Sequence, residues 1–592
     1  MKNKKIFSIF SIILLFFIDS NLIFSQHQFY VNLNERGEDL FHVTLYPEKL
    51  TKKNKVFNFA ATAPGTYQLM NIGRYVRSFQ AFNKDENQIP AEKISENRWA
   101  ISKPEEVSRV VYSIAETWDT PVDNYSIFLM AGTSIENDHV LINNQAVFGY
   151  FDGMQDYPIN IKLDYPDDWK IGTALNKNEE GFYTAENYDY LVDSPILLGR
   201  LSEAKLNVSR TEIEVYTYSK TDLIKAQDLL DAVKDIIFAA EKFLVKLPVD
   251  RYTFLFHFED QSAGAWEHSY SSEYVFTEAP PTKNYLATLS SFVSHEFFHI
   301  ITPLNIHSEL ITYFNFAEPK MSQHTWLYES VTEWASNVVQ LRGGLFSLEE
   351  YLADVTKKMN QSDVYKKDLS LTELALNSFE MQDQFYIVYC RGAVTMTLLD
   401  IKLLEESGGK KGLREVINEL AKDYGPQKSF SEENFFQEFT DKTYPDIMDF
   451  FNKYVKGAEP LPVKEYFKKL GINYFESAGY DSSKIGFEFN AVFKEGKLVI
   501  ESAQNEALPI KHGDVFYKYK GEEILPGNVG PIFAEINNMK PGEMVTFIMK
   551  REGKEFEFNY KLMPKEIKYL LKADENPSSE QLKLREAWQK NL

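Results

Sequence analysis

Two histidines and one glutamate in the stretch SSFVSHEFFHIIT have the spacing of a metal-binding helix. His295 and His299 are four residues apart, so on a helix their imidazoles point the same way and can hold one Zn²⁺. Glu296 lies one position round the helix and can reach a water on the metal without binding the metal itself. Chance gives roughly 0.02 occurrences of this pattern in a chain of 592 residues with 10 histidines. The pattern therefore needs independent support elsewhere in the chain.

A catalytic zinc takes a third protein ligand, and two downstream glutamates are candidates. Glu318 lies in NFAEPK, a predicted loop that runs into Pro319. Glu329 lies in TWLYESVTEWAS, whose apolar residues predict the start of a buried helix. A ligand on a packed helix is better preorganised than one on a loop, which favours Glu329. Glu333, one turn further on, is either a partner for the spare N–H of a ligand histidine or an exposed helix carboxylate.

Upstream of the motif, the stretch GAWEH contains candidate substrate-binding residues. Gly264 and Ala265 at a strand edge would let a peptide backbone lie close and pair as an added strand. The carboxylate of Glu267 could bind the free ammonium of a peptide N-terminus, which is the chemistry of an aminopeptidase. On its own this stretch is a weak signal, because GxxE loops are common.

Downstream, the stretch VYCRGAVTMTLLDIKLL predicts a helix that opens near Tyr389. A phenol directed at the metal could hydrogen-bond the oxyanion that forms on an attacked carbonyl. The alternative is an ordinary buried tyrosine, one of 34. Cys390, the only cysteine, is expected in the core rather than as a reactive thiol, and it excludes both an intramolecular disulfide and a cysteine-rich zinc site.

Composition and charge restrict the class of protein. The chain is 44% hydrophobic and 25% charged, which excludes wholesale disorder. A net charge of −22 repels phosphate backbones, so we expect no nucleic-acid partner. Residues 1–25 combine a basic start with an apolar run from Ile6 to Ile18, shorter than the ~20 residues that span a bilayer. We therefore predict a signal peptide, an exported periplasmic or extracellular protein, and no stable membrane span after its removal.

The elements that must position these residues follow an α+β multi-domain pattern. Short alternating strands over 26–205 predict an N-terminal β-sandwich-like domain. Over 206–455 the pattern becomes mostly helical, with a long amphipathic helix from Thr221, and this is the expected catalytic domain. A linker is predicted over 456–475, a second region of short strands over 476–563, and a charged, solvated tail over 564–592.

Four signals occur in order along the chain: GAWEH, HEFFH, WLYES and YCRG. Together they resemble the gluzincin zinc metallopeptidases, and most closely the glycyl aminopeptidase family, whose members often end in a PDZ domain. The stretch AATAPGTYQLMNIGRYVRSFQAFNKDENQIP resembles the N-terminal β domain of that family, and IGFEF with GDVFYKYKGEEI resembles a PDZ domain. The resemblance implies a thermolysin-like catalytic domain and a C-terminal PDZ-like β domain.

The resemblance also implies a role for each matching residue: one zinc per chain on His295, His299 and Glu329, with Glu296 as general base. It implies Tyr389 as oxyanion stabiliser and Glu267 as amine anchor. Three other histidines are expected in pocket walls or at the surface rather than on the metal: His268, His307 and His324. Departures from the family pattern, such as Ala265 in place of a second glycine, put glycine specificity in doubt.

The favoured function is an exported zinc aminopeptidase acting on peptides. Two alternatives remain: a zinc endopeptidase or non-peptide hydrolase on the same scaffold, and a PDZ-bearing binding protein with a silent metal site. In the PDZ-like domain, Gly486 and Phe487 are predicted beside a loop that binds the C-terminal carboxylate of a peptide ligand. The same domain could instead be a structural cap on the helical body.

Overall fold

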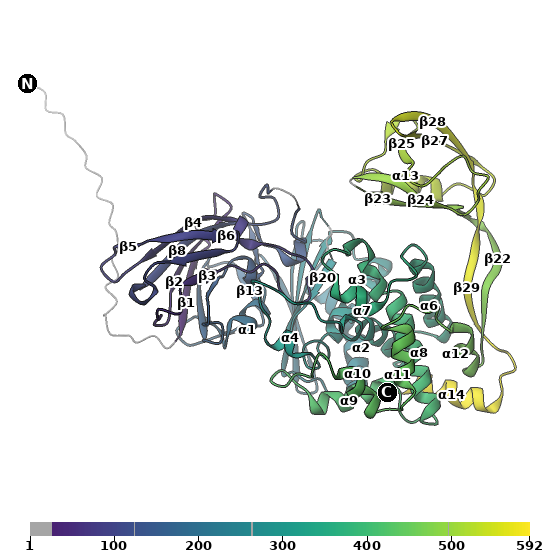
Figure 1. The fold of residues 1–592 in the computed structure, drawn as a ribbon, viewed down its shortest axis with the longest axis horizontal. Helices are drawn as coiled ribbons and strands as arrows, with labels where there is room; N and C mark the ends of the chain where they lie inside the picture. Colours follow the sequence, from purple (N-terminus) through teal and green to yellow (C-terminus); the bar gives the residue numbers. More distant parts are fainter. Residues whose placement is uncertain (1–25, 123–124, 262–263, 495, 592) are drawn as a thin grey trace, which may run out of the picture.

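The computed structural model describes residues 26–122, 125–261, 264–494 and 496–591. A β-rich N-terminal part is followed by a mostly helical body, and a small β domain stands off from that body on an arm of two paired strands (Figure 1). This is the α+β multi-domain architecture expected from the sequence. The predicted signal peptide, residues 1–25, lies outside the described residues.

The N-terminal part contains three sheets around one core. The largest has the strand order β14-β15-β12-β1-β2-β8-β4-β5. Its strands are β1 (His27–Asn32), β2 (Leu40–Tyr46), β4 (Val76–Phe82), β5 (Gln88–Ile89), β8 (Arg109–Ala115), β12 (Ile159–Asp164), β14 (Asn176–Lys177) and β15 (Tyr183–Ala185). Residues of β2 alternate between buried and accessible positions, as expected for a sheet with one packed face.

A second sheet, of order β11-β3-β7-β6, packs on the largest one. Its strands are β3 (Val56–Asn58), β6 (Ala91–Ser95), β7 (Arg98–Ile101) and β11 (Tyr150–Phe151). The ring of Phe57 in β3 lies 5.2 Å from Phe79 and 5.9 Å from Tyr112, which belong to the larger sheet. These contacts between sheets give the sandwich-like packing that the sequence predicts.

The third sheet, of order β13-β16-β10-β9, faces the helical body. Its strands are β9 (Ser134–Ile135), β10 (His139–Ile142), β13 (Lys170–Thr173) and β16 (Ile196–Gly199). Leu141 of β10 and Leu197 of β16 share a buried cluster with Leu255 and Val275 from the sheet of the next domain. The two domains are therefore joined by a continuous apolar contact.

The body, which is the expected catalytic domain, begins with a sheet of order β17-β18-β19-β21-β20, in which β20 is an edge strand. Its strands are β17 (Ser202–Val208), β18 (Thr211–Ser219), β19 (Arg251–Glu259), β20 (Gly264–Glu267) and β21 (Ser271–Thr277). The predicted amphipathic helix is α2 (Ala226–Phe243), which starts later than expected. Leu223 lies within the predicted helix, but it precedes the observed one and is 42% exposed.

Helices make up most of the remaining body (Figure 1). They include α3 (Lys283–Phe298), α5 (Val331–Arg342), α6 (Leu348–Ser362), α8 (Arg391–Glu406), α9 (Leu413–Asp423), α10 (Phe435–Asp441) and α11 (Ile447–Tyr454). A wide π-type turn, Trp326–Ser330, leads directly into α5. Trp326 and Trp334 are both fully buried there, so this segment is fixed by packing on both sides.

The prediction of a solvated tail over 564–592 is wrong. The strand β29 (Met563–Ala573) pairs antiparallel with β22 (Ile472–Gly486) to form the arm, and α14 (Ser579–Lys590) returns to the helical body (Figure 1). Trp588 is 0% exposed, and its carbonyl accepts a hydrogen bond from the Arg342 guanidinium at 2.9 Å. Burial of one indole, favourable by about 2–3 kcal/mol, holds an otherwise polar segment in place.

The predicted linker is also partly folded, because α12 (Val463–Lys469) lies within 456–475 and buries Phe467. Beyond the arm, the C-terminal β domain has the sheet order β23-β24-β25-β27-β28. It contains β23 (Phe489–Lys494), β24 (Lys497–Ala503), β25 (Val515–Tyr519), β26 (Glu522–Glu523), α13 (Val529–Asn537), β27 (Met544–Arg551) and β28 (Lys554–Lys561). Its apolar core is separate from that of the body.

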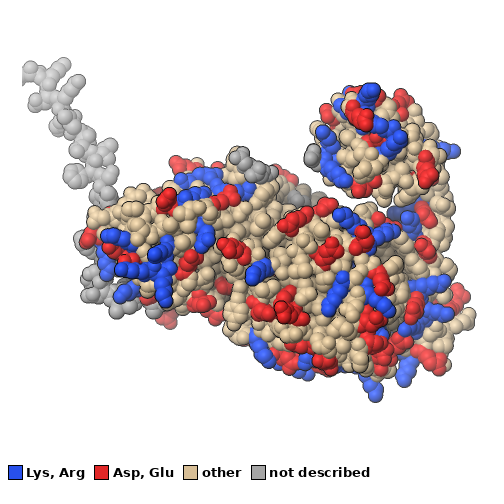
Figure 2. Space-filling view, viewed as in Figure 1, with Lys and Arg blue, Asp and Glu red and all other residues tan. Residues whose placement is uncertain are grey.

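Acidic and basic side chains are interspersed over the helical body and the C-terminal β domain on the face that Figure 2 shows. Within the part of the chain that the structure describes, no helix is both long and apolar enough to cross a bilayer.

Candidate active site

The two histidines of the HEFFH motif lie on the last turn of α3 and its C-cap. Their Nε2 atoms are 3.2 Å apart, and Oε2 of Glu329 lies 3.5 Å from that of His295 and 3.7 Å from that of His299. A circle through these three atoms has a radius of about 2.0 Å, the length of a zinc–nitrogen bond. The donor set and its size therefore fit a zinc ion.

Other groups hold the two imidazoles in this orientation. Nδ1 of His295 lies 2.7 Å from Oε2 of Glu333, and Glu333 is itself paired with the Lys358 ammonium. Nδ1 of His299 donates to the Thr302 carbonyl at 3.0 Å. Both rings thereby present Nε2 to the centre, as is usual for histidines that bind metals. The structure places Glu333 beside His295 in a buried network and not on an exposed helix face.

Glu318, the competing third ligand, is not among the residues that converge with His295 and His299. Its side chain is 77% exposed and its carboxylate pairs with Arg98 at 3.7 Å. Glu329 is 2% exposed on the packed π-type turn before α5. The carboxylate that converges with the two imidazoles is thus the one on the packed segment.

Tyr67 is a residue at this site that we did not single out from the sequence. Its hydroxyl donates to Oε1 of Glu329 at 2.8 Å, and its ring lies 4.4 Å from that of Phe385. Tyr67 adopts a left-handed backbone conformation with φ 47°, which costs energy for a bulky residue and is typical of functional sites. No local sequence pattern predicts the contact between Tyr67 and Glu329, because the two residues are 262 positions apart.

Glu267 ends the edge strand β20 and lies beside the same centre. One oxygen of its carboxylate, a nitrogen of His299 and an oxygen of Glu329 all lie within 4.8 Å of one another. Burial and the nearby Glu329 and Glu296 carboxylates raise the pKa of Glu267 well above its ordinary value. A cation close to the Glu267 carboxylate stabilises its ionised form, and the ammonium of a peptide would be such a cation.

The strand that carries Glu267 leaves one edge unpaired within the described sheet. Gly264 has φ 122°, and a side chain added there would meet nothing within 4 Å. Gly264 therefore lies beside open space at a strand edge, whereas Ala265 packs against the core of the body. The N-terminal domain covers the other side, because the carbonyl of Pro64 accepts a hydrogen bond from the indole of Trp266 at 3.2 Å.

Glu296 and Tyr389 face the same region. Burial raises the pKa of Glu296 to about 8; His295 lowers it, while Glu329 and Glu333 raise it further. The Tyr389 ring lies 5.4 Å from that of His295. Burial and the Glu329 and Glu296 carboxylates hold the pKa of the Tyr389 phenol well above its ordinary value, so it stays a hydrogen-bond donor. Cys390 is fully buried, and burial raises the pKa of its thiol to about 11.

The three histidines that we expected away from the metal are buried, and each has a protein group as its partner. His268 lies 3.4 Å from Asp193, Nδ1 of His307 donates to the Pro303 carbonyl, and Nε2 of His324 donates to the Glu432 carbonyl.

In the C-terminal domain, Gly486 ends β22 against the backbone of Lys565, where a side chain would meet Cα at 2.9 Å. The Phe487 ring packs 5.8 Å from Phe533 of α13.

Models of known protein families match two parts of the chain. Residues 28–200 match the family model of the Peptidase M61 N-terminal domain, and residues 288–390 match that of the M61 glycyl aminopeptidase. The chain therefore contains both M61 peptidase domains that these models describe. The resemblance of its motifs to the M61 glycyl aminopeptidases is confirmed. Its matched segments contain HEFFH, Glu329 and Tyr389.

Among solved structures, one agrees with this chain in fold over nearly its whole length, and two others are similar at a lower level. An aminopeptidase N family protein from Idiomarina loihiensis is 19% identical, with a TM-score of 0.76 over 94% of this chain and 99% of its own. An M1 zinc metallopeptidase from Deinococcus radiodurans is 11% identical, with a TM-score of 0.45 over 74% of this chain and 94% of its own. Yeast LTA4 hydrolase is 15% identical, with a TM-score of 0.47 over 75% of this chain and 70% of its own. No curated protein matches the chain.

Proposed function

We propose that this chain is an exported aminopeptidase that removes N-terminal residues from peptides. The observation that carries the proposal is the buried carboxylate of Glu267, which ends an unpaired strand edge next to the cluster of His295, His299 and Glu329. A peptide paired with β20 would run towards this carboxylate, and its free ammonium would neutralise it. The substrate of an endopeptidase continues past this position, where the buried carboxylate of Glu267 would block it.

In the proposed mechanism, His295, His299 and Glu329 hold one zinc ion. When bound, this ion supplies a Lewis acid that activates water and polarises the scissile carbonyl. Glu296 takes a proton from the attacking water and passes it to the leaving amine. The Tyr389 hydroxyl donates a hydrogen bond to the oxyanion, and Tyr67 and Glu333 keep Glu329 and His295 in position.

The test compares pairs of substrates that differ only at the N-terminus. Alanyl p-nitroanilide and its N-acetylated form are assayed with the purified chain, with and without a chelator, at pH 7.5. Cleavage of the free amine alone, abolished by the chelator and restored by Zn²⁺, supports the aminopeptidase. Equal cleavage of the acetylated substrate would instead favour a zinc endopeptidase or a non-peptide hydrolase.

We also propose that the C-terminal β domain is PDZ-like and takes the C-terminus of a peptide by strand addition. Two features support this: β23 is an edge strand of its sheet, and Phe487 lies between that strand and α13. A test variant replaces residues 487–562 by a short turn and keeps β29 and α14, because Trp588 is buried in the body. Slower hydrolysis of long substrates with unchanged hydrolysis of short ones is expected; no difference would indicate a structural cap.

Export is proposed from the residues at the N-terminus. N-terminal sequencing of protein from the native host is expected to begin near Gln26, and a chain that begins at Met1 in the cytoplasm would contradict it.

A further inference from the structure

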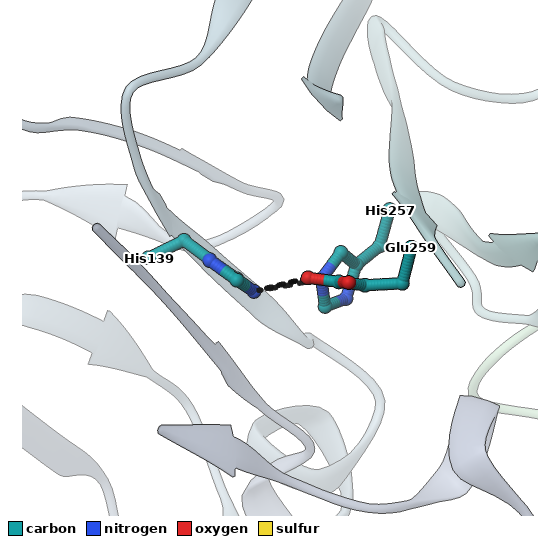
Figure 3. A group of neighbouring side chains, drawn as sticks. All are labelled: His139, His257 and Glu259. Carbon is teal, nitrogen blue, oxygen red and sulfur yellow. Dashed lines mark hydrogen bonds and ion pairs between the residues drawn. The ribbon is translucent and has the colours of Figure 1, made fainter. Parts of the chain in front are cut away.

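A second cluster of two histidines and one glutamate lies where the N-terminal and catalytic domains meet. His139 begins β10 of the N-terminal domain, whereas His257 and Glu259 belong to β19 of the catalytic sheet (Figure 3). Residues two apart on a strand face the same side, so His257 and Glu259 both point towards His139. Their side chains are 1%, 1% and 7% exposed in that order: His139, His257, Glu259.

The ligand atoms of this cluster have the dimensions of a zinc site. The Nε2 atoms of His139 and His257 are 2.9 Å apart, and Oε1 of Glu259 lies 3.5 Å from the first and 3.8 Å from the second. A circle through the three atoms has a radius of about 2.0 Å, the same as for the cluster on α3. A single proton could bridge only one pair of these atoms, whereas a divalent cation satisfies all three.

Neighbouring groups orient two of the three side chains, His139 and Glu259, as they do around metals. Nδ1 of His139 lies 2.9 Å from Oδ1 of Asp138, whose other oxygen pairs with the Arg200 guanidinium at 2.5 Å. Such a carboxylate fixes the tautomer that leaves the Nε2 lone pair free. Oε2 of Glu259 accepts from the Lys220 ammonium at 2.9 Å, which leaves Oε1 to the centre.

Aromatic rings wall the centre and limit rotation of the imidazoles. The Tyr218 ring stacks on His139 with 3.7 Å between centroids, and the Trp118 ring stacks on His257 at 4.8 Å. The centre is therefore closed to a peptide, unlike the open strand edge at Gly264.

We propose that His139, His257 and Glu259 form a second zinc site that joins the N-terminal domain to the catalytic domain. Imidazole and carboxylate ligands suit Zn²⁺, and one water completes four-fold coordination. Because the ligands come from both domains, ion binding stabilises their interface. The expected zinc content of the chain then rises from one ion to two.

The direct test counts zinc by mass spectrometry after dialysis against zinc-free buffer with no chelator. The wild-type chain is expected to hold two equivalents, and His139→Gln and Glu259→Gln one each. His42→Gln changes an exposed histidine and is the matched control for loosely bound surface zinc, with two equivalents expected. Glu329→Gln is expected to lose the other equivalent, so loss of the second site and loss of the proposed catalytic site are measured separately.

If the wild-type chain holds one equivalent of zinc and His139→Gln holds the same, the proposal is overturned. His139 and His257 would then form only a hydrogen-bonded pair. Two equivalents that survive in both His139→Gln and Glu259→Gln would overturn it as well, because the extra zinc would then lie elsewhere. If these variants do not fold, X-ray absorption of the wild-type chain decides. Two equivalents of zinc with an average of three protein ligands per zinc support the site. A zinc content of one equivalent contradicts it.

Discussion

The molecule has two clusters with the same types of ligand and nearly the same dimensions, but their surroundings differ. One is the cluster on α3, which Glu329 completes, and the other is the cluster between the domains. On α3, the space beside His295 and His299 contains Glu296, Glu267 and an unpaired strand edge. Between the domains, stacked rings and buried strands close the space around His139 and His257. The comparison teaches that ligand geometry selects the ion, whereas the adjacent base and open edge determine whether chemistry follows.

The second difference concerns how well the imidazoles are held. Both histidines on α3 have a partner at Nδ1. In the other cluster only His139 has one, because Nδ1 of His257 is buried with no partner among the described residues. Loss of such a partner typically weakens metal binding about 10- to 100-fold. We therefore expect the interdomain site to lose zinc first as a chelator is added.

The largest expected effect separates the two clusters by activity. Glu296→Gln removes the proposed base and is expected to lower kcat about 10²- to 10⁴-fold while zinc stays bound. Glu259→Gln, which removes the carboxylate ligand of the other cluster, is expected to keep kcat within about twofold, because no substrate reaches that centre. Steady-state kinetics and zinc content of both variants check this. Comparable losses of kcat in the two variants would erase the functional difference.

Glu267→Gln tests whether the charge of the Glu267 carboxylate is needed to bind the ammonium of a peptide at the edge of β20. The amide keeps the size of the side chain but loses its attraction for an ammonium, which is worth about 1.5–3 kcal/mol for a charged hydrogen bond. We expect kcat/KM on alanyl p-nitroanilide to fall about 10- to 100-fold. If zinc content falls together with activity, Glu267 acts as a metal ligand and the amine-anchor role is wrong.

Tyr67→Phe removes the hydroxyl that donates to Glu329 and nothing else. The zinc dissociation constant, measured by competition with a coloured chelator, is expected to rise about tenfold. Tyr313→Phe is the matched control, since Tyr313 is 80% exposed and should leave the constant unchanged. An unchanged constant in Tyr67→Phe would show that the N-terminal domain does not support this centre.

The smallest effect concerns His324, a buried histidine outside both clusters. Burial lowers its pKa from 6.5 to about 4. Between these values the unfolded chain binds a proton that the folded chain does not, so stability falls as the pH falls through this window. His324→Gln removes this contribution, and the free energy of unfolding should then decline less steeply with falling pH, by up to about 1.4 kcal/mol per unit. An unchanged slope in chelator-treated protein would contradict it.

Sequence reasoning reached those residues whose relations are local. The four-residue spacing of His295 and His299 needs only a helix, and the apolar run around Glu329 indicates a packed segment. Tyr67 and Glu329 are 262 residues apart, and His139 and His257 are 118 apart. Such contacts depend on how domains meet, which no local period encodes.

Two clues were nonetheless present. The HFE triplet in YTFLFHFE places His257 and Glu259 on one face of a strand, and Trp588 is a large apolar residue in a segment otherwise read as solvated. Neither clue names its partner. The paired arm of β22 and β29 was missed for the same reason, because its two strands are separated by the whole C-terminal β domain.

An anomalous difference map collected at the zinc edge from crystals of the full chain tests the central claim most directly. The account predicts a peak about 2.1 Å from Nε2 of His295, Nε2 of His299 and an oxygen of Glu329. A peak bound by Glu318 in place of Glu329, or no peak at this centre in an active preparation, would contradict it.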